Sequence, residues 1–188
     1  MKNETYRGLN AQLNLFNDDG RIQLDKDKEA AHAYFLEVVN PNTVFFHTLE
    51  EKINYMVDEG MWDEKVVRKF DFRVVKELFK RAYDKKFRFP TFLGAYKFYS
   101  QYAMKTLDGT RWLERFEDRV VLNALAYSSN IRHAETMIDL IIAGVFQPAT
   151  PTFLNAGRVR GGKPVSCFLL RIEDNMESIA RGIHDSLQ

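Results

Sequence analysis

Apolar side chains recur at helical spacing along most of this chain, from about residue 25 to residue 144. An α-helix has 3.6 residues per turn, so one face collects residues three, four, seven and eight positions apart. The first such stretch contains Ala31, Tyr34, Phe35, Val38 and Val39. This periodicity favours packed helices over strands, and it predicts an all-α domain over residues 1–144.

Start and stop signals divide this region into six expected helices. Residues 40–42 (Asn-Pro-Asn) end the first, because proline lacks a backbone donor. Thr48 and Glu51 have the spacing of a capping box, in which each side chain bonds the other's backbone N–H, and Gly60 supplies a left-handed stop. The remaining four helices are expected at about Asp71–Ala82, Thr91–Thr106, Arg111–Ser128 and Asn130–Gly144.

The pattern changes after Gly144. Residues 147–152 (QPATPT) are predicted to be non-helical, because each proline disfavours a helix at its own position and at the one before. Residues 165–172 (VSCFLLRI) form an apolar run typical of a strand buried on both faces. Asp174 and Glu177 then open an amphipathic helix. Residues 145–188 are therefore predicted to begin an α/β domain that continues beyond Gln188.

Charge and hydropathy narrow the classes of partner. The chain has 27 Lys and Arg against 26 Asp and Glu, without the basic excess of a nucleic-acid-binding protein. The longest apolar run, residues 138–146, is far shorter than the ~20 residues that span a bilayer. The only cysteine, Cys167, excludes an intrachain disulfide and fits a reducing compartment. We expect a cytoplasmic protein that binds neither nucleic acid nor a membrane.

One basic stretch resembles a phosphate-binding loop without completing it. Residues 157–163 (GRVRGGK) match the first seven positions of a P-loop, but Pro164 replaces the Ser or Thr that would bind magnesium. We interpret its glycines as a turn and its cations as solvated surface. These cations are Arg158, Arg160 and Lys163. The four histidines show no zinc-type spacing, so no metal site is expected.

Taken singly, the polar residues between positions 148 and 174 have plain structural explanations. Cys167 could be a small buried hydrophobe, Thr150 a turn residue and Asp174 a helix N-cap. On that interpretation the chain is a non-catalytic α-helical interaction module with a buried, inert cysteine. Its alternative is an enzyme whose thiol reacts, and the rate of modification by a disulfide reagent distinguishes the two.

Taken together, these residues carry a family resemblance. Residues 147–174 read QPATPTFLNAGRVRGGKPVSCFLLRIED, which resembles the segment of class I ribonucleotide reductase large subunits that begins their ten-stranded α/β barrel. The combination of TPTFLNAG with SCFLL is most similar to the class Ib branch. Upstream, DKDKEAAHAYF, NTVFFH, KKFRFPTF and LERFEDR resemble the helical amino-terminal region of that branch. The resemblance covers essentially the whole chain.

The resemblance implies a chemistry and a role for four residues. In this family a thiyl radical abstracts the ribose 3′ hydrogen of a ribonucleoside diphosphate, and two cysteines then supply the reducing equivalents. Cys167 matches the first of these redox cysteines, while Thr150 and Ser166 match positions that contact the substrate. Asp174 matches a contact to the nucleotide effector that selects the substrate base.

The resemblance also implies partners beyond this chain. They are the remainder of the large subunit, a second large subunit, a small metal-radical subunit, a redoxin-type thiol reductant, and deoxynucleoside triphosphate or ATP effectors. No cofactor is expected on these residues themselves. The thiyl cysteine, the second redox cysteine, the relay tyrosines and the tail cysteines would all follow Gln188, so the chain alone is expected to be inactive. The family's full ATP-binding cone is expected to be absent or shortened.

Overall fold

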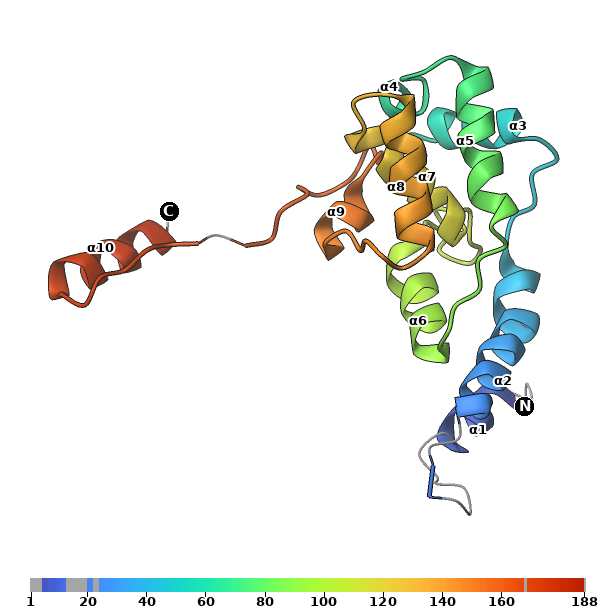
Figure 1. Ribbon diagram of the computed structural model, residues 1–188, viewed down its shortest axis with the longest axis horizontal. Helices are drawn as coiled ribbons and strands as arrows, with labels where there is room; N and C mark the ends of the chain where they lie inside the picture. The colour runs from blue at the N-terminus through green and yellow to red at the C-terminus, as the bar shows by residue number, and fades with distance from the viewer. Residues whose placement is uncertain (1–4, 13–19, 22–23, 168, 188) are drawn as a thin grey trace.

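The computed structural model describes residues 5–12, 20–21, 24–167 and 169–187. Within these ranges the regular structure is helical, and no β-strand is present. Figure 1 shows a body of packed helices, from which an extended segment leads away to the last helix. The α-helices are α1 (Thr5–Gln12), α2 (Leu24–Tyr34), α3 (Leu49–Asp58), α4 (Glu64–Val67), α5 (Phe72–Asp84), α6 (Phe92–Lys97), α7 (Phe116–Tyr127), α8 (Ile131–Ile142), α9 (Thr150–Asn155) and α10 (Met176–Ser186).

Helix α7 is the centre of the helical body. Its residues from Phe116 to Leu125 are buried with the exception of Glu117, and helices α4, α5, α8 and α9 all contact it. A helix that is buried on nearly every side must be apolar around most of its circumference. The run Val120–Val121–Leu122 meets that requirement with three side chains that are fully buried. Helix α7 therefore supplies the surface on which the other elements are positioned.

Several predicted helix boundaries are confirmed. Thr48, Asp71, Thr91 and Asn130 each accept a backbone N–H as N-caps of α3, α5, α6 and α8. Gly60 and Gly144 both have positive φ angles after their helices. The capping box at α3 differs in one partner: Glu51 accepts from the backbone N–H of His47 rather than that of Thr48.

Two boundaries are wrong for the same reason. Helix α6 continues only as the π-helical turn Phe98–Tyr102, and α7 begins at Phe116 rather than at Arg111. Between these helices Trp112 bridges to both Thr43 and Lys105 in extended backbone. Its N–H donates to the carbonyl of Asn42, a tertiary hydrogen bond that overrides the local helical pattern.

The prediction that residues 147–152 are non-helical is also wrong. Helix α9 begins at Thr150 and contains Pro151 in its first turn. Proline is tolerated there because the N–H that it lacks would have no partner within the helix, and because its fixed φ suits a helix start. Helix α9 packs against α7, so the helical body extends past the predicted boundary at Gly144.

The predicted buried strand at residues 165–172 is not found. Phe168 lies outside the described residues, and the others are exposed in extended backbone; the side chain of Leu169 is 96% exposed. A strand requires a hydrogen-bonded neighbour, and no other described segment pairs with this one. Helix α10 does follow as predicted, but its N-cap is Asn175 rather than Asp174. Among the described residues, no helix combines the length and apolar character of a membrane span.

Gly157, which follows α9, is expected to tolerate alanine less well than Gly144. Both have φ angles near +70°, which costs an L-residue about 1–2 kcal/mol. An added Cβ at Gly157 would also lie 3.2 Å from Cδ2 of the buried Leu122, whereas nothing lies within 4 Å at Gly144. Gly157→Ala should therefore lower the free energy of unfolding, measured with urea, by at least about 1 kcal/mol more than Gly144→Ala. Equal losses would contradict this packing.

Candidate functional site

Thr150 occupies the first position of α9, and its side chain is exposed. Its hydroxyl lies 3.1 Å from the hydroxyl of Tyr102, and either group can donate. Helix α9 packs against α7, so a short element on a buried support presents Thr150 at the surface. That arrangement leaves the Thr150 hydroxyl accessible to a ligand.

The segment that follows α9 folds back onto it. The Thr152 hydroxyl donates to the carbonyl of Pro164 at 3.1 Å. The Asn155 amide donates to the carbonyl of Lys163 at 3.2 Å and accepts from the N–H of Gly162 at 2.9 Å. These three hydrogen bonds hold residues 162–164 against α9. Two residues span at most about 7 Å, so Ser166 begins close to the helix that carries Thr150.

Ser166 and Cys167 lie on this outgoing segment with exposed side chains. The Ser166 hydroxyl oxygen is 3.6 Å from the Cys167 sulfur. The interpretation of Cys167 as a buried hydrophobe is therefore wrong, since its free thiol is exposed. An exposed thiol beside a hydroxyl can exchange protons and form a disulfide with a second thiol.

The stretch that resembles a P-loop makes a turn, as predicted. It follows helix α9 and leads into extended backbone, whereas a phosphate-binding loop opens a helix. A Cβ at Gly161 would lie 3.0 Å from the Asn155 carbonyl oxygen, and one at Gly162 would lie 3.2 Å from the Asn155 side-chain nitrogen. These glycines allow the backbone to approach Asn155.

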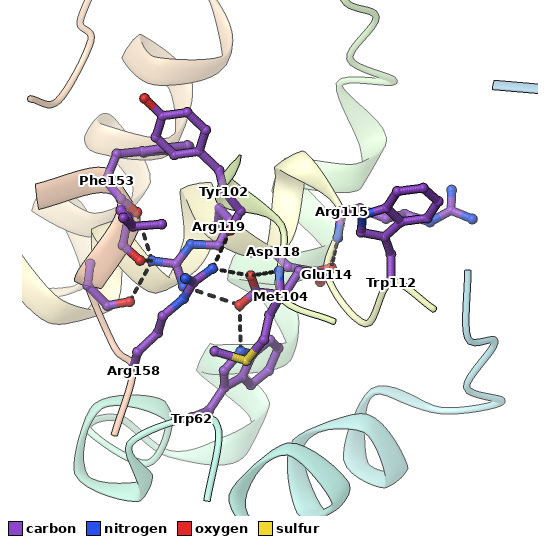
Figure 2. Close-up of polar contacts among 12 residues, drawn as sticks. Trp62, Tyr102, Met104, Trp112, Glu114, Arg115, Asp118, Arg119, Phe153 and Arg158 are labelled. Carbon is purple, nitrogen blue, oxygen red and sulfur yellow. Dashed lines mark hydrogen bonds and ion pairs between the residues drawn. The ribbon is translucent and has the colours of Figure 1, made fainter. Parts of the chain in front are cut away.

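Arg119 attaches α9 to α7. Its side chain is fully buried, and Nη2 donates to the carbonyls of Phe153, Leu154 and Ala156 at 2.8, 3.2 and 2.7 Å. The last carbonyls of a helix have no partner within the helix, so a cation placed there satisfies them. Asn123, one turn later on α7, also donates to the Phe153 carbonyl, at 3.2 Å. Figure 2 shows the Arg119 side chain directed at this end of α9.

Glu114 accepts hydrogen bonds from four donors in the same cluster (Figure 2). They are Trp62 Nε1 at 2.7 Å, Met104 N at 2.9 Å, Arg119 Nη1 at 3.2 Å and Arg158 Nη2 at 2.9 Å. Complete burial opposes ionisation of the carboxyl group, but the two guanidinium groups and the two other donors hold its pKa below the usual value. Glu114 is therefore an ionised carboxylate that joins three separate segments.

Arg158 does not lie on a solvated surface, so that interpretation is wrong. Its side chain is 13% exposed, and besides Glu114 it donates to the backbone carbonyl of Tyr102. No role was predicted from the sequence for Glu114, Arg119 or Tyr102. One signal was available: Arg119 and Asn123 interrupt an apolar helix four positions apart, which places both on one buried face.

Asp174 lies apart from this cluster. It is exposed in the bend before α10, and Figure 1 shows α10 beyond the extended segment, away from α9.

Two cavities, of about 680 and 500 Å³, lie in the helical body, but Thr150, Ser166, Cys167 and Asp174 line neither. No group of three or more His, Cys, Asp or Glu side chains suited to a metal is found in the described parts of the chain. The four expected site residues are all exposed.

Replacing Glu114 with glutamine should destabilise the chain strongly. The change keeps the shape but leaves the guanidinium groups of Arg119 and Arg158 without their counter-charge, which should cost about 3 kcal/mol of unfolding free energy. Glu135→Gln is the matched control, because Glu135 forms an exposed pair with Arg81 at 3.7 Å. It should change stability by less than about 0.5 kcal/mol. Similar urea midpoints for both variants would contradict the role of Glu114.

The stability difference between the parent chain and Glu114→Gln should depend on pH in one direction. Because the folded pKa of Glu114 is lowered, its stabilising contribution is complete above the pKa of an unfolded glutamate, about 4.3. That contribution is lost as the pH falls through the lower folded pKa. The gap between the parent chain and Glu114→Gln should therefore narrow below about pH 4 in urea titrations.

The sequence of this chain matches one family of known proteins over nearly its whole length. Residues 6–87 match the family described as "Ribonucleotide reductase N-terminal", and residues 88–161 match "Ribonucleotide reductase, all-alpha domain". The chain is 48% identical over 181 residues to the ribonucleoside-diphosphate reductase subunit alpha of Bacillus subtilis, covering 96% of this chain and 26% of that protein. It is 45% identical over 186 residues to the corresponding subunit of Mycoplasma genitalium, covering 98% and 25%. The chain thus spans about a quarter of these relatives, and it belongs to the ribonucleotide reductase family, matching the amino-terminal part of the large subunit.

Proposed function

We propose that this chain contributes half of the redox cysteine pair and part of the substrate site to a ribonucleoside-diphosphate reductase large subunit. The complete subunit would reduce ribonucleoside diphosphates to deoxyribonucleoside diphosphates for DNA synthesis. One observation carries the proposal: the exposed Cys167 leaves from a turn that is hydrogen-bonded to α9, the helix that presents Thr150. Family membership supports the reaction, and the exposed Cys167 thiol beside the Ser166 hydroxyl supports the proposed roles of these two residues.

Cys167 is proposed to act after the radical has formed on the ribose. Its thiol protonates the departing 2′-hydroxyl, which leaves as water. The thiolate then forms a disulfide with a second cysteine, and the pair gives up two electrons and two protons in total. Serine cannot replace it, because an alcohol does not form the two-electron disulfide. The exposed thiol favours this role over an inert one.

Thr150 and Ser166 are proposed to bind the substrate through their hydroxyl groups. Short hydroxyl side chains donate one hydrogen bond and accept two, which suits phosphate and ribose oxygens. Both side chains are exposed, and both belong to the elements joined at residues 152–164. The substrate would therefore lie over the exposed side of α9 and of the segment after Pro164.

Asp174 is proposed to contact the nucleotide effector at an interface between two large subunits. It precedes α10, whose exposed apolar side chains include Met176 at 77% and Ile183 at 58%. A second large subunit would cover this face and place the effector beside the start of α10.

Other parts of the reductase would complete the chemistry. We propose that the chain following the helical body, after residue 161, begins the α/β barrel, and that the remainder of the large subunit supplies the thiyl cysteine and the second redox cysteine. A small metal-radical subunit would generate the radical, and a redoxin would reduce the disulfide. This chain needs no resident cofactor for its share. A thiol that must be kept reduced fits a cytoplasmic enzyme.

Replacing Cys167 with serine tests the redox assignment. In a complete large subunit that contains these residues, Cys167→Ser should abolish multiple turnover while leaving substrate affinity intact, because the thiol acts after binding. The melting temperature should change little, since the side chain is exposed. Ser166→Ala is the neighbouring control, and it should weaken substrate binding without stopping the redox cycle. A Cys167→Ser enzyme with normal multiple turnover would exclude the assignment.

Replacing Asp174 with alanine should impair the effector response more than basal turnover. The assay compares reduction of each of the four substrates with and without deoxynucleoside triphosphates. Asn175→Ala is the control for helix capping, because the Asn175 side chain accepts a hydrogen bond from Ser178 N at 2.9 Å. Loss of this cap should lower the free energy of unfolding by about 1 kcal/mol. Asp174→Ala should leave stability unchanged. An intact effector response in Asp174→Ala would remove this residue from the effector site.

A further inference from the structure

Tyr102 is held in place at three points, and its hydroxyl meets Thr150. Its ring stacks on Phe98 with centroids 6.4 Å apart and planes within 2°, and it packs against Phe153 at 5.8 Å. Its backbone carbonyl accepts a hydrogen bond from Arg158. The remaining contact is the one between the hydroxyl groups of Tyr102 and Thr150, at 3.1 Å. Tyr102 is therefore a fixed side chain whose polar end points at the proposed substrate contact.

The hydrogen atoms at this contact decide what Thr150 can do. A threonine hydroxyl has one proton and two lone pairs. When Tyr102 donates to Thr150 Oγ1, the only proton of Thr150 is left for a further acceptor. A threonine that receives a hydrogen bond also becomes a better donor, because linked hydrogen bonds polarise one another. An acceptor oxygen on a ligand is the partner that this geometry leaves open.

We propose that Tyr102 is a positioning residue that directs the Thr150 hydroxyl toward an oxygen of the ribonucleoside diphosphate. This inference rests on the proposed function, in which Thr150 binds the substrate. Tyr102 does not touch the substrate; it fixes the rotamer of Thr150 and leaves the threonine proton free. The support for Tyr102 comes from the buried cluster, since Arg158 binds both its carbonyl and Glu114.

The two sides of the contact differ in their surroundings. Tyr102 is half-buried, with its ring between Phe98 and Phe153, whereas Thr150 is exposed. Removing only the phenol oxygen would keep the ring packing and the bond from Arg158 to the carbonyl. Tyr102→Phe therefore isolates the hydroxyl contact from the packing of the helical body.

The experiment uses the complete large subunit with its small subunit and a thiol reductant. Tyr102→Phe should raise KM for the ribonucleoside diphosphate about five- to tenfold with little change in kcat, because one hydrogen bond that orients a binding group is lost. Tyr55→Phe, which removes a surface hydroxyl from α3, should leave both constants unchanged. The melting temperatures of both variants should stay close to that of the parent enzyme.

A double-mutant cycle distinguishes positioning from a general structural effect. Thr150→Ala should raise KM, and adding Tyr102→Phe to it should raise KM no further, because the group being positioned is already absent. Thr150→Ser retains the hydroxyl and should remain sensitive to Tyr102→Phe. A parental KM in Tyr102→Phe, or an equal loss in the Thr150→Ala background, would overturn the inference about Tyr102 alone.

The other outcomes bear on the proposed function. If the parent enzyme is active but Thr150→Ala leaves KM unchanged, Thr150 does not bind the substrate, and its assignment fails together with that of Tyr102. If the parent enzyme reduces no ribonucleotide under these conditions, the proposed function itself is overturned, and the positioning role falls with it. If KM rises with Thr150→Ala but not with Tyr102→Phe, the proposed function stands and only the positioning role of Tyr102 is rejected.

Discussion

The ion pairs and hydrogen bonds of the buried Glu114 carboxylate are the interactions on which the arrangement of the helical body depends. Removing a charge from water costs several kcal/mol, and a protein recovers that cost only when the buried charge is paired and fully hydrogen-bonded. Glu114 meets both conditions, because two guanidinium groups, an indole N–H and a backbone N–H converge on it. Each donor comes from a different part of the sequence, so forming the cluster requires Trp62, Met104 and the segment at Arg158 to meet in one geometry.

The consequences of this pairing reach the surface through two arginines. Arg119 pairs with Glu114 and also binds three carbonyls at the end of α9, which fixes the helix that presents Thr150. Arg158 pairs with the same carboxylate and binds the carbonyl of Tyr102, whose hydroxyl lies within hydrogen-bond distance of the Thr150 hydroxyl. A buried charge cluster thus sets the position of an exposed hydroxyl. Rigid support of this kind is what a binding group needs in order to hold its geometry before the ligand arrives.

The sequence predicted the helices that local signals define, but not the contacts between distant segments. Caps at Thr48 and Asn130 were predictable because the side chain and the N–H that it binds are three residues apart. The start of α7 was not, since Trp112 is held in extended backbone by residues about 70 positions earlier. The burial of Arg158 was hidden for the same reason: its partner Glu114 lies 44 positions away. Helix α9 shows the opposite error, in which the rule against proline was applied without regard to Pro151's place in the first turn.

The segment at residues 165–172 shows how a local pattern can be sound and still give no regular element. Its apolar side chains fit a strand with both faces covered, yet Val165 is 61% exposed and Leu169 96% exposed. Burying a side chain of this size is worth about 1.5–3 kcal/mol, so the described residues leave a substantial stabilising contribution unused. Cys167 lies in the middle of this run with its thiol exposed. In the function we propose, neighbouring barrel strands from the rest of a large subunit would cover the apolar side chains, and the same strands would bring a second cysteine toward Cys167. Completion of the fold and completion of the redox pair are therefore one structural requirement in the function we propose.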